Sequence, residues 1–142
     1  MKKTLSLLVV SLLVAATTVA LVGCGGKSSP TAPSTPQPFH QTLTGTVDVF
    51  GTTFHPVTIP RTGQMTISLT WPETLDLDLY LTNSACSADT LNQCQLFASA
   101  TGTVGNREVV TRSVTQAETF RVFVDNTSLD LGSNYTLQID IQ

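Results

Sequence analysis

Basic residues are scarce in this sequence and do not cluster. Seven lysine and arginine residues stand against ten acidic ones among 142 residues, which gives a formal net charge of −3. A protein that binds nucleic acid usually presents a basic face that neutralises phosphates. The sequence holds no such cluster, and no basic patch for acidic lipids. We therefore expect no nucleic-acid partner.

The short motifs of common enzymes are also missing. The sequence contains no Gly-x-Ser-x-Gly, no His-Glu-x-x-His and no phosphate-binding Gly-Lys-Ser/Thr loop. Its two histidines are His40 and His55, and a lone histidine in a strand is more often structural or solvent-facing than catalytic. We predict that the protein is not an enzyme and has no cofactor, apart from the calcium considered below.

Residues 40–142 lack helical periodicity and instead alternate apolar and polar residues. Met65, Ile67, Leu69 and Trp71 share one face, so Trp71 is expected in the core rather than as a platform for a sugar ring. About eight such segments, separated by turn sequences, predict an all-β antiparallel β-sandwich. The expected strands cover residues 43–50, 54–59, 64–71, 75–81, 95–100, 107–114, 119–125 and 134–142.

The first 23 residues are organised like a secretory signal peptide. Lys2 and Lys3 precede an uncharged run that extends from Leu5 to Val22. An uncleaved transmembrane helix is the alternative, because the run is close to the ~18 apolar residues that such a helix needs. Residues 24–39 are rich in Gly, Ser, Thr and Pro, which predicts an extended tether before a single domain at 40–142.

The stretch Leu21-Val22-Gly23-Cys24 resembles the lipobox of bacterial lipoproteins. The resemblance implies that the Cys24 sulfur is acylated, that the leader is cut before Cys24, and that an N-acyl chain such as palmitate joins the diacylglycerol there. Stable membrane anchoring needs more than one acyl chain. Residue 25 is Gly, not the Asp that retains such proteins at the inner membrane, so the resemblance implies the outer membrane of a bacterial cell envelope.

Two further cysteines, Cys86 and Cys94, flank a polar stretch of seven residues. The oxidising compartment of an exported protein favours a disulfide, worth about 2.5 kcal/mol in the loop-entropy treatment. The alternative is a two-thiol metal site, which needs further ligands at metal-site spacing. The neighbouring sequence supplies none, so we predict a Cys86–Cys94 disulfide.

The segment Asp-Leu-Asp-Leu-Tyr-Leu at 76–81 alternates strictly. Its leucines are expected to face the core, while Asp76 and Asp78 point the opposite way, roughly 6 to 7 Å apart by the strand rise. Three interpretations remain open: a solvated face, a structural calcium site completed by Glu73, Asp89 or backbone carbonyls, and a catalytic carboxylate pair. The solvated face is the one that we favour.

Two aromatic residues, Tyr80 and Phe123, fall on the opposite face from their apolar neighbours. In the segment around Phe123, the core-facing residues are expected to be Phe120, Val122 and Val124. Tyr80 and Phe123 are therefore the predicted candidates for an exposed aromatic binding surface.

The order of these segments resembles the bacterial pre-peptidase C-terminal domain over residues 41–142. The similar parts are an opening strand with a glycine (LTGTVDVF), TISLTW, DLDLYL, and a closing Gly132-x-x-Tyr135-x-Leu137. The resemblance implies a jelly-roll-like β-sandwich that accompanies exported peptidases and other exported enzymes. It also implies that calcium or an extracellular polymer such as collagen could be a ligand.

These observations lead to one principal functional hypothesis. The protein is expected to be a lipid-anchored, non-enzymatic β-sandwich module in the cell envelope, with a binding or structural role toward an envelope protein or an extracellular polymer. The alternatives are a small envelope hydrolase that uses the Asp76 and Asp78 face, or an accessory subunit of an exported peptidase.

Overall fold

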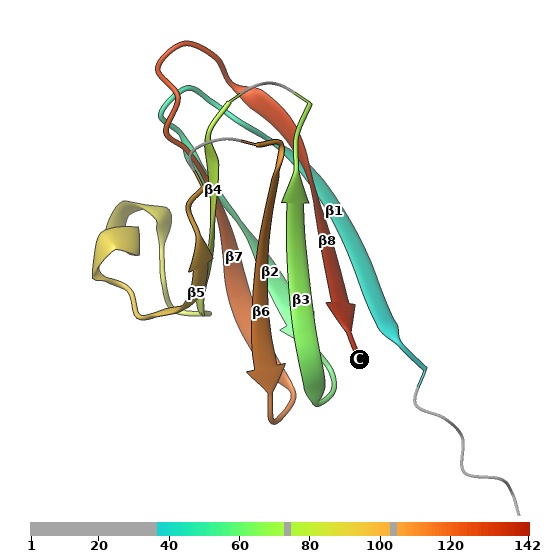
Figure 1. Cartoon of the computed structure of the whole chain (residues 1–142). Helices are drawn as coiled ribbons and strands as arrows, with labels where there is room; N and C mark the ends of the chain where they lie inside the picture. Colours follow the sequence, from blue (N-terminus) through green and yellow to red (C-terminus); the bar gives the residue numbers. More distant parts are fainter. Residues whose placement is uncertain (1–36, 73–74, 103–104) are drawn as a thin grey trace, which may run out of the picture. The chain divides into compact units, whose positions relative to one another are not determined.

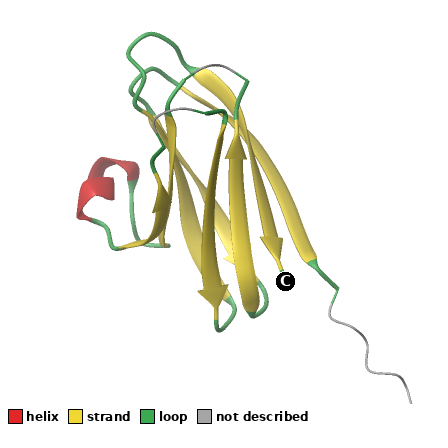
Figure 2. Ribbon diagram, viewed as in Figure 1, coloured by secondary structure: helices red, strands yellow, loops and turns green. Residues whose placement is uncertain are grey.

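The computed structural model describes residues 37–72, 75–102 and 105–142. These residues contain eight β-strands and one short 3-10 helix, η1 (Ala88–Gln93), which the sequence did not predict (Figures 1 and 2). Every strand that alternation predicts is present, and the all-β fold class is confirmed. The strands are β1 (Phe39–Val47), β2 (Thr52–Ile59), β3 (Gly63–Thr70), β4 (Leu77–Asn83), β5 (Leu96–Ala100), β6 (Arg107–Val114), β7 (Glu118–Asn126) and β8 (Ser133–Ile141).

The first strand is shifted toward the N-terminus relative to its predicted span of 43–50. It begins at Phe39, which pairs with Ile141 of β8, and it ends at Val47. The residues beyond it form a turn in which the Gly51 amide donates to the Asp48 carbonyl over 3.0 Å. Gln41 and Gly45 occupy inward positions of β1 and interrupt its apolar pattern, which is why alternation alone placed the strand too late.

The eight strands form two four-stranded antiparallel sheets. Sheet I has the order β1-β8-β3-β6, and sheet II has the order β2-β7-β4-β5. Every connection except β4–β5 passes from one sheet to the other, as the strand orders require. Eight strands in this order are those of a jelly roll, so the predicted jelly-roll-like sandwich is confirmed.

Inward-facing side chains of both sheets make the core. Leu77, Leu79 and Leu81 of β4 are 0% exposed, as the alternation predicts, and burying one leucine stabilises the fold by roughly 1.5–3 kcal/mol. Trp71 is also buried, and its indole nitrogen donates to the Leu75 carbonyl over 3.1 Å. The prediction that Trp71 packs in the core is therefore confirmed.

The glycine in the opening strand has a packing reason. Gly45 pairs with Tyr135 across β1 and β8, and a Cβ atom at position 45 would overlap the Tyr135 hydroxyl group. That hydroxyl lies 2.7 Å from Nε2 of His55 on β2. Gly45 thus makes room for a tyrosine–histidine contact that joins the two sheets.

The chain enters and leaves the sandwich at the same end. Phe39 at the start of β1 pairs with Ile141 near the C-terminus. The turn 48–51 and the loop 127–132 lie at the opposite end, at the top of Figure 1; we call these two segments the loop end. In the part of the chain that the structure describes, no helix has the length and apolar character to cross a membrane.

The outer faces of the two sheets differ in composition. One row across sheet I reads Thr44, Thr136, Thr70, and the next reads Thr42, Gln138, Ser68. Corresponding rows across sheet II contain aromatic and acidic residues. One row reads Phe54, Phe123, Tyr80, and the next row reads Thr52, Asp125, Asp78.

Candidate binding surfaces

The predicted acidic and aromatic residues do lie together on the outer face of sheet II. Asp78 and Tyr80 of β4 face Asp125 and Phe123 of β7. The direction of each side chain follows from alternation, since Phe120, Val122 and Val124 point inward and are 0% exposed. The outward directions of Asp78, Tyr80 and Phe123 are those that alternation predicts, whereas the pairing of the two strands comes from the structure.

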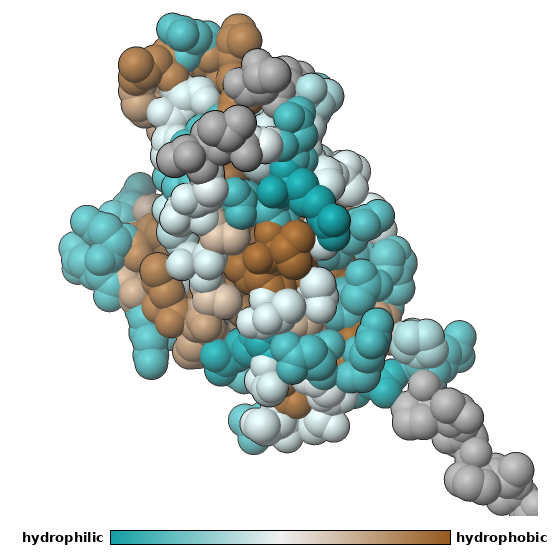
Figure 3. Space-filling view, viewed as in Figure 1, coloured by the Kyte–Doolittle hydropathy of each residue, from teal (hydrophilic) through white to brown (hydrophobic). Residues whose placement is uncertain are grey.

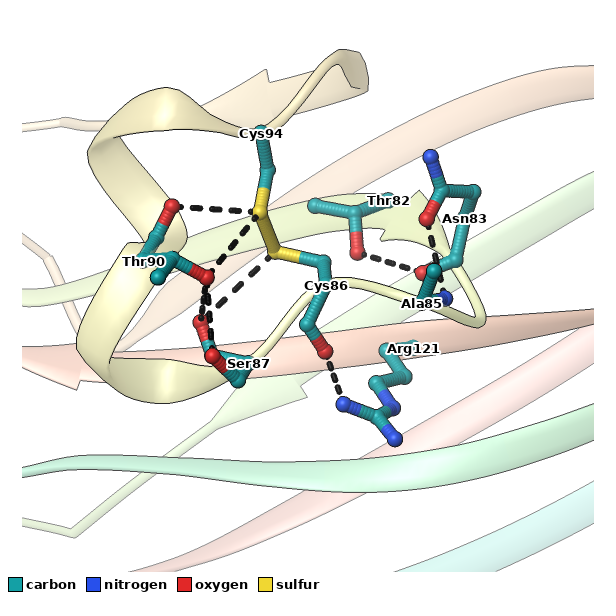
Figure 4. The surroundings of a disulfide bond; sticks show 8 residues. All are labelled: Thr82, Asn83, Ala85, Cys86, Ser87, Thr90, Cys94 and Arg121. Carbon is teal, nitrogen blue, oxygen red and sulfur yellow. Dashed lines mark hydrogen bonds between the residues drawn. A yellow bond between two sulfur atoms is a disulfide. The ribbon is translucent and has the colours of Figure 1, made fainter.

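A disulfide-closed loop covers part of that face. Cys86 and Cys94 are bonded, with their Cα atoms 5.8 Å apart, and η1 lies between them (Figure 4). This confirms the predicted disulfide. The Arg121 guanidinium, which projects from the outer face of β7, donates to the Cys86 carbonyl. This hydrogen bond, together with contacts between η1 and β2, fixes the loop 84–95 over sheet II.

The prediction that Phe123 offers an exposed aromatic ring is wrong. Phe123 is 0% exposed although it points away from the core. Its ring packs against that of Phe54 with 5.4 Å between centroids, and Tyr80 pairs with it from β4. Alternation identified its direction, but it could not show that side chains of the neighbouring strands would exclude water there.

Tyr80 remains partly exposed and borders a cavity. The cavity has a volume of about 370 Å³ and lies between the outer face of sheet II and the loop. Thr52, Tyr80 and Asp125 line it from the sheet, while Ala88, Asp89 and Leu91 line it from η1. Burial and the hydrogen bond to Asp78 raise the pKa of the Tyr80 hydroxyl, so Tyr80 acts as a neutral donor at ordinary pH. A ligand contact by Tyr80 stays a prediction.

Asp78 does not have the solvated surroundings that the sequence favoured. It is 7% exposed, and the Tyr80 hydroxyl donates to its Oδ2 over 2.9 Å. Burial raises the pKa of the Asp78 carboxyl, and the negative charges of Asp76, Asp125 and Glu108 raise it further, whereas the Tyr80 hydrogen bond acts in the opposite direction. Asp78 is thus a largely covered carboxylate in an acidic neighbourhood.

Asp76 is held by a different part of the chain. The Thr127 hydroxyl donates to its Oδ2 over 3.1 Å, and the Thr127 amide donates to its carbonyl over 3.2 Å. Among the described residues, no three or more His, Cys, Asp or Glu side chains form a group that could hold a metal ion. Glu73 lies outside the described residues, as does Cys24, and Asp89 lies on η1. Calcium binding and carboxylate catalysis at Asp76 and Asp78 stay predictions.

His40 takes part in a hydrogen-bonded chain on sheet I. Its Nδ1 lies 2.6 Å from Oδ1 of Asp140, and its Nε2 lies 3.1 Å from Oγ1 of Thr42. The order of acid, imidazole and hydroxyl is that of hydrolytic triads. However, the His40 and Asp140 side chains are 56% and 47% exposed. They stand in water on an open sheet face, whereas such catalysis depends on a site that excludes water.

An uncharged groove lies near the other end of this sheet face. It has a volume of about 600 Å³ and is open to solvent. Hydroxyl and amide side chains from three strands dominate its lining, joined by Trp71 and Pro72 at its edge. The polar members are Thr44, Thr46, Thr70, Thr136 and Asn134.

The loop end presents large apolar side chains to solvent. Val49 and Phe50 in the turn are 40% and 64% exposed, and Leu129 and Leu131 in the neighbouring loop are 69% and 57% exposed. Figure 3 shows these segments as a group of brown residues interrupted by teal at the top of the molecule. Large apolar side chains exposed together often mark an interaction site.

Buried Asn126 connects the two segments of the loop end. It is 1% exposed, and its side-chain amide donates to the carbonyls of Asp48, over 2.9 Å, and Leu131, over 2.8 Å. Its backbone amide donates to the Gly51 carbonyl over 2.9 Å. A Cβ atom at Gly132 would come within 2.7 Å of the Val47 carbonyl oxygen, so glycine permits this close approach.

Comparisons with known proteins agree on the fold. No protein-family model and no curated protein sequence matches this chain. Among solved structures, it is similar to the pre-peptidase C-terminal domain of a collagenase from Bacillus anthracis. The TM-score is 0.52 at 13% sequence identity, and the match covers 70% of this chain and 88% of that domain. The predicted likeness to this domain is therefore confirmed for the fold.

Two other solved structures share the architecture. A periplasmic inhibitor of g-type lysozyme from Aeromonas hydrophila matches with a TM-score of 0.52 and 9% identity, over 72% of this chain and 86% of that one. A mitogen derived from Yersinia pseudotuberculosis matches with a TM-score of 0.54 and 18% identity, over 75% and 88%. Identities this low establish a common fold and nothing more specific.

The sequence reasoning missed the loop end as a surface. Its signal is present in Asp48-Val-Phe-Gly51 and Ser128-Leu-Asp-Leu-Gly-Ser133, where large apolar residues stand inside turn sequences. Such residues have no sheet face on which to be buried, because turns run over the surface of a domain. Alternation instead placed residues 48–50 in the first predicted strand, and the turn residues at 130–133 served only to separate two strands.

Proposed function

We propose that this protein is a non-enzymatic binding module, held at the outer membrane of a bacterial cell envelope by lipid on Cys24, that contacts a partner protein through its loop end. The observation that carries the binding role is the exposure of Phe50, Leu129 and Leu131 on hydrogen-bonded loops. Ordinary solvation of a monomer gives no reason to gather three such side chains at one end.

The position of the loop end supports this role. The chain reaches the domain through β1, whose nine residues span about 30 Å from Phe39 to Val47. The turn 48–51 of the loop end follows directly after Val47, so the loop end lies at the far end of the domain from Phe39, where β1 begins. A surface placed in this way is available to a partner while the chain is tethered.

The three solved structures of similar fold support a module of this kind. Their printed descriptions are a domain appended to a collagenase, an inhibitor of an enzyme, and a mitogen. Each description concerns its own protein, but all three fit a sandwich that acts through contact rather than catalysis. For this chain the inference rests on the loop end.

Two measurements in intact cells test the proposal. Metabolic labelling with a fatty-acid analogue should mark the wild type and not Cys24→Ala, and the variant should leave the outer-membrane fraction. A photoreactive p-benzoylphenylalanine at position 50 should give a discrete cross-linked protein. The same group in place of exposed Gln138, on the outer face of sheet I, is the matched control. Labelling of Cys24→Ala would contradict the anchor, and identical adducts from both positions would contradict the binding role.

The uncharged groove on sheet I favours a second candidate function, the binding of an extracellular polymer. Its hydroxyl and amide lining suits the hydroxyl groups of a neutral polysaccharide. Retention of the protein on insoluble polysaccharides tests it: Thr136→Val with Asn134→Ala should reduce retention, whereas Phe50→Ser should not. Loss of retention in Phe50→Ser alone would assign polymer binding to the loop end instead.

A further inference from the structure

The loop end combines its apolar side chains with carboxylates. Exposed Asp48 directly precedes Val49, and exposed Asp130 lies between Leu129 and Leu131. We propose that the partner of the loop end is a basic protein, one that offers an apolar pocket for Phe50 and the two leucines, rimmed by lysine or arginine side chains. This inference rests on the proposed binding role and adds the chemistry of the partner.

The carboxylates of the loop end have no cationic partner within residues 37–72, 75–102 and 105–142. No lysine or arginine among the described residues pairs with Asp48 or Asp130. Each arginine of the described residues is engaged elsewhere. Arg61 donates to the Gln37 carbonyl, Arg107 donates to the Ser68 hydroxyl, Arg112 lies over the Phe97 ring, and Arg121 lies over the Phe54 ring.

More negative charge lies behind the two exposed carboxylates. Asp76 is hydrogen-bonded to Thr127 of the same loop, and Asp125 immediately precedes Asn126 at the end of β7. Charges of one sign gathered at one end of a protein attract a partner of opposite sign and speed its approach. Asp48 and Asp130 are themselves exposed and adjoin the apolar residues in the sequence, so we place them at the rim of the interface, where a charge pair retains some solvent.

The same charges disfavour the other occupants of an apolar surface. Anionic lipid headgroups would be repelled by Asp48 and Asp130, since membrane surfaces attract basic segments. Two copies of the chain that met symmetrically through their loop ends would bring four of these carboxylates together. A basic protein surface is the occupant for which both the apolar and the charged residues are favourable.

The support of the loop end is suited to binding without rearrangement. Asn126 holds both segments through three hydrogen bonds. Phe50 has a positive φ of 50°, a region that non-glycine residues rarely occupy, and Gly51 closes the turn behind it by donating to Asp48. A side chain presented on such a fixed turn loses less conformational freedom on binding than one on a mobile loop.

A phage library of random dodecapeptides, panned on the detergent-solubilised mature protein, tests the proposal. The enriched peptides should combine lysine or arginine with aromatic or aliphatic residues, and their affinity should fall as salt rises. Phe50→Ser should weaken the selected peptides by about tenfold or more, as loss of a central aromatic residue does. Val109→Ser, which removes an apolar side chain that is 40% exposed on sheet I, is the matched control and should leave binding unchanged.

Charge variants separate the partner chemistry from the binding role. Asp48→Asn with Asp130→Asn should weaken binding several-fold and flatten its salt dependence, while Asp89→Asn, at an exposed carboxylate of η1, should do neither. Peptides that need Phe50 but show no excess of basic residues would overturn the basic-partner inference and leave the binding role intact. If no peptide is enriched and position 50 gives no cross-link in cells, both proposals fail.

The competing occupants have their own readouts. Hydrogen exchange of residues 48–51 and 127–132 should be the same in detergent and in phosphatidylglycerol vesicles that carry the lipidated protein. Slower exchange in the vesicles would identify a lipid surface as the occupant. A dimer in sedimentation experiments that Phe50→Ser dissociates would identify a second copy. Either result overturns the inference.

Discussion

The outer faces of the two sheets follow the same alternation but have different surroundings. On sheet I, outward residues such as Thr44, Thr136 and Gln138 face water in an open array. On sheet II, outward Phe123 is 0% exposed and outward Asp78 is 7% exposed, because the side chains of Phe54 and Tyr80 pack against them. Direction relative to the core and exposure to water are thus separate properties of a strand residue.

The composition of each face agrees with its surroundings. A hydroxyl-rich face makes its hydrogen bonds with water and needs no cover. On sheet II, by contrast, the rings of Phe54 and Phe123 pack against each other, and the Arg121 guanidinium lies over the Phe54 ring while it donates to the Cys86 carbonyl. Sheet II therefore has a second, smaller layer of packing outside the main core.

A charge in the main core should have the largest effect. Leu79→Asp places an unpaired carboxylate between the sheets, where the leucine is 0% exposed, and should destabilise the domain by more than about 4 kcal/mol. Thr136→Asp on the open face of sheet I is the matched control and should cost less than about 1 kcal/mol. Urea unfolding measures both, and a folded Leu79→Asp variant of near wild-type stability would contradict the sandwich.

Truncation of Phe123, the buried aromatic residue on the outer face of sheet II, should have the second-largest effect on the unfolding free energy. Phe123→Ala should cost about 3 kcal/mol, the range for a buried aromatic residue, although its side chain points away from the core. Val109→Ala, at an outward apolar residue that is 40% exposed on sheet I, should cost less than about 0.5 kcal/mol. Equal losses of unfolding free energy would show that the two faces are equally solvated.

Removal of the disulfide should have an intermediate effect. Cys86→Ser with Cys94→Ser should lower the unfolding free energy by about 2.5 kcal/mol while the eight strands stay folded at room temperature. Backbone amides around Phe123 should then exchange faster, because the loop 84–95 no longer stays over sheet II, whereas those of β1 should not change. Free thiols in the protein as isolated from the envelope would contradict the bond itself.

The smallest effect is expected at Asp78, and its sign depends on pH. Because burial raises the pKa of this carboxyl above its ordinary value of 3.8, the unfolded chain releases the proton first as pH rises. The stability that the protonated form contributes is present below about pH 4 and is lost as pH rises through the folded-state pKa.

Asparagine at position 78 carries no charge and still accepts the Tyr80 hydroxyl. Asp78→Asn should therefore be slightly more stable than the wild type at pH 7, and this advantage should vanish below about pH 4. Urea unfolding between pH 3 and pH 8 measures the difference. A variant that is less stable than the wild type at pH 7 would show that the ionised carboxylate is favourable in the fold.

Alternation predicted the strands because a sheet face in contact with a core demands a period of two. It gave the number of strands, the inward leucines of β4 and the burial of Trp71, since each depends on residues close in sequence. The cysteine pair was also predictable, because compartment and spacing decide it. The largest error in a strand's position is that of β1, where Gln41 and Gly45 interrupt the pattern, and the short helix η1 was missed.

The surfaces were harder to predict because they depend on segments distant in sequence. Phe123 packs against Phe54, some seventy residues earlier, and the loop 84–95 is held by Arg121, some thirty residues later. The loop end forms because Asn126 joins a turn near residue 48 to a loop near residue 131. No local sequence pattern encodes such contacts between distant segments. Large apolar residues within a turn sequence are nevertheless a sign that the turn is an interaction site.

The pairing of β1 with β8 has a mechanical consequence. The two strands are joined over nine residues, from Phe39 with Ile141 to Val47 with Ser133. A force that holds the loop 127–132 and pulls on the chain at Phe39 acts along β8 and β1 in opposite directions. The hydrogen bonds of an antiparallel pair run perpendicular to the strands, so this load shears all of them at once instead of opening them singly. β1 and β8 together thus resist a force applied between Phe39 and the loop 127–132.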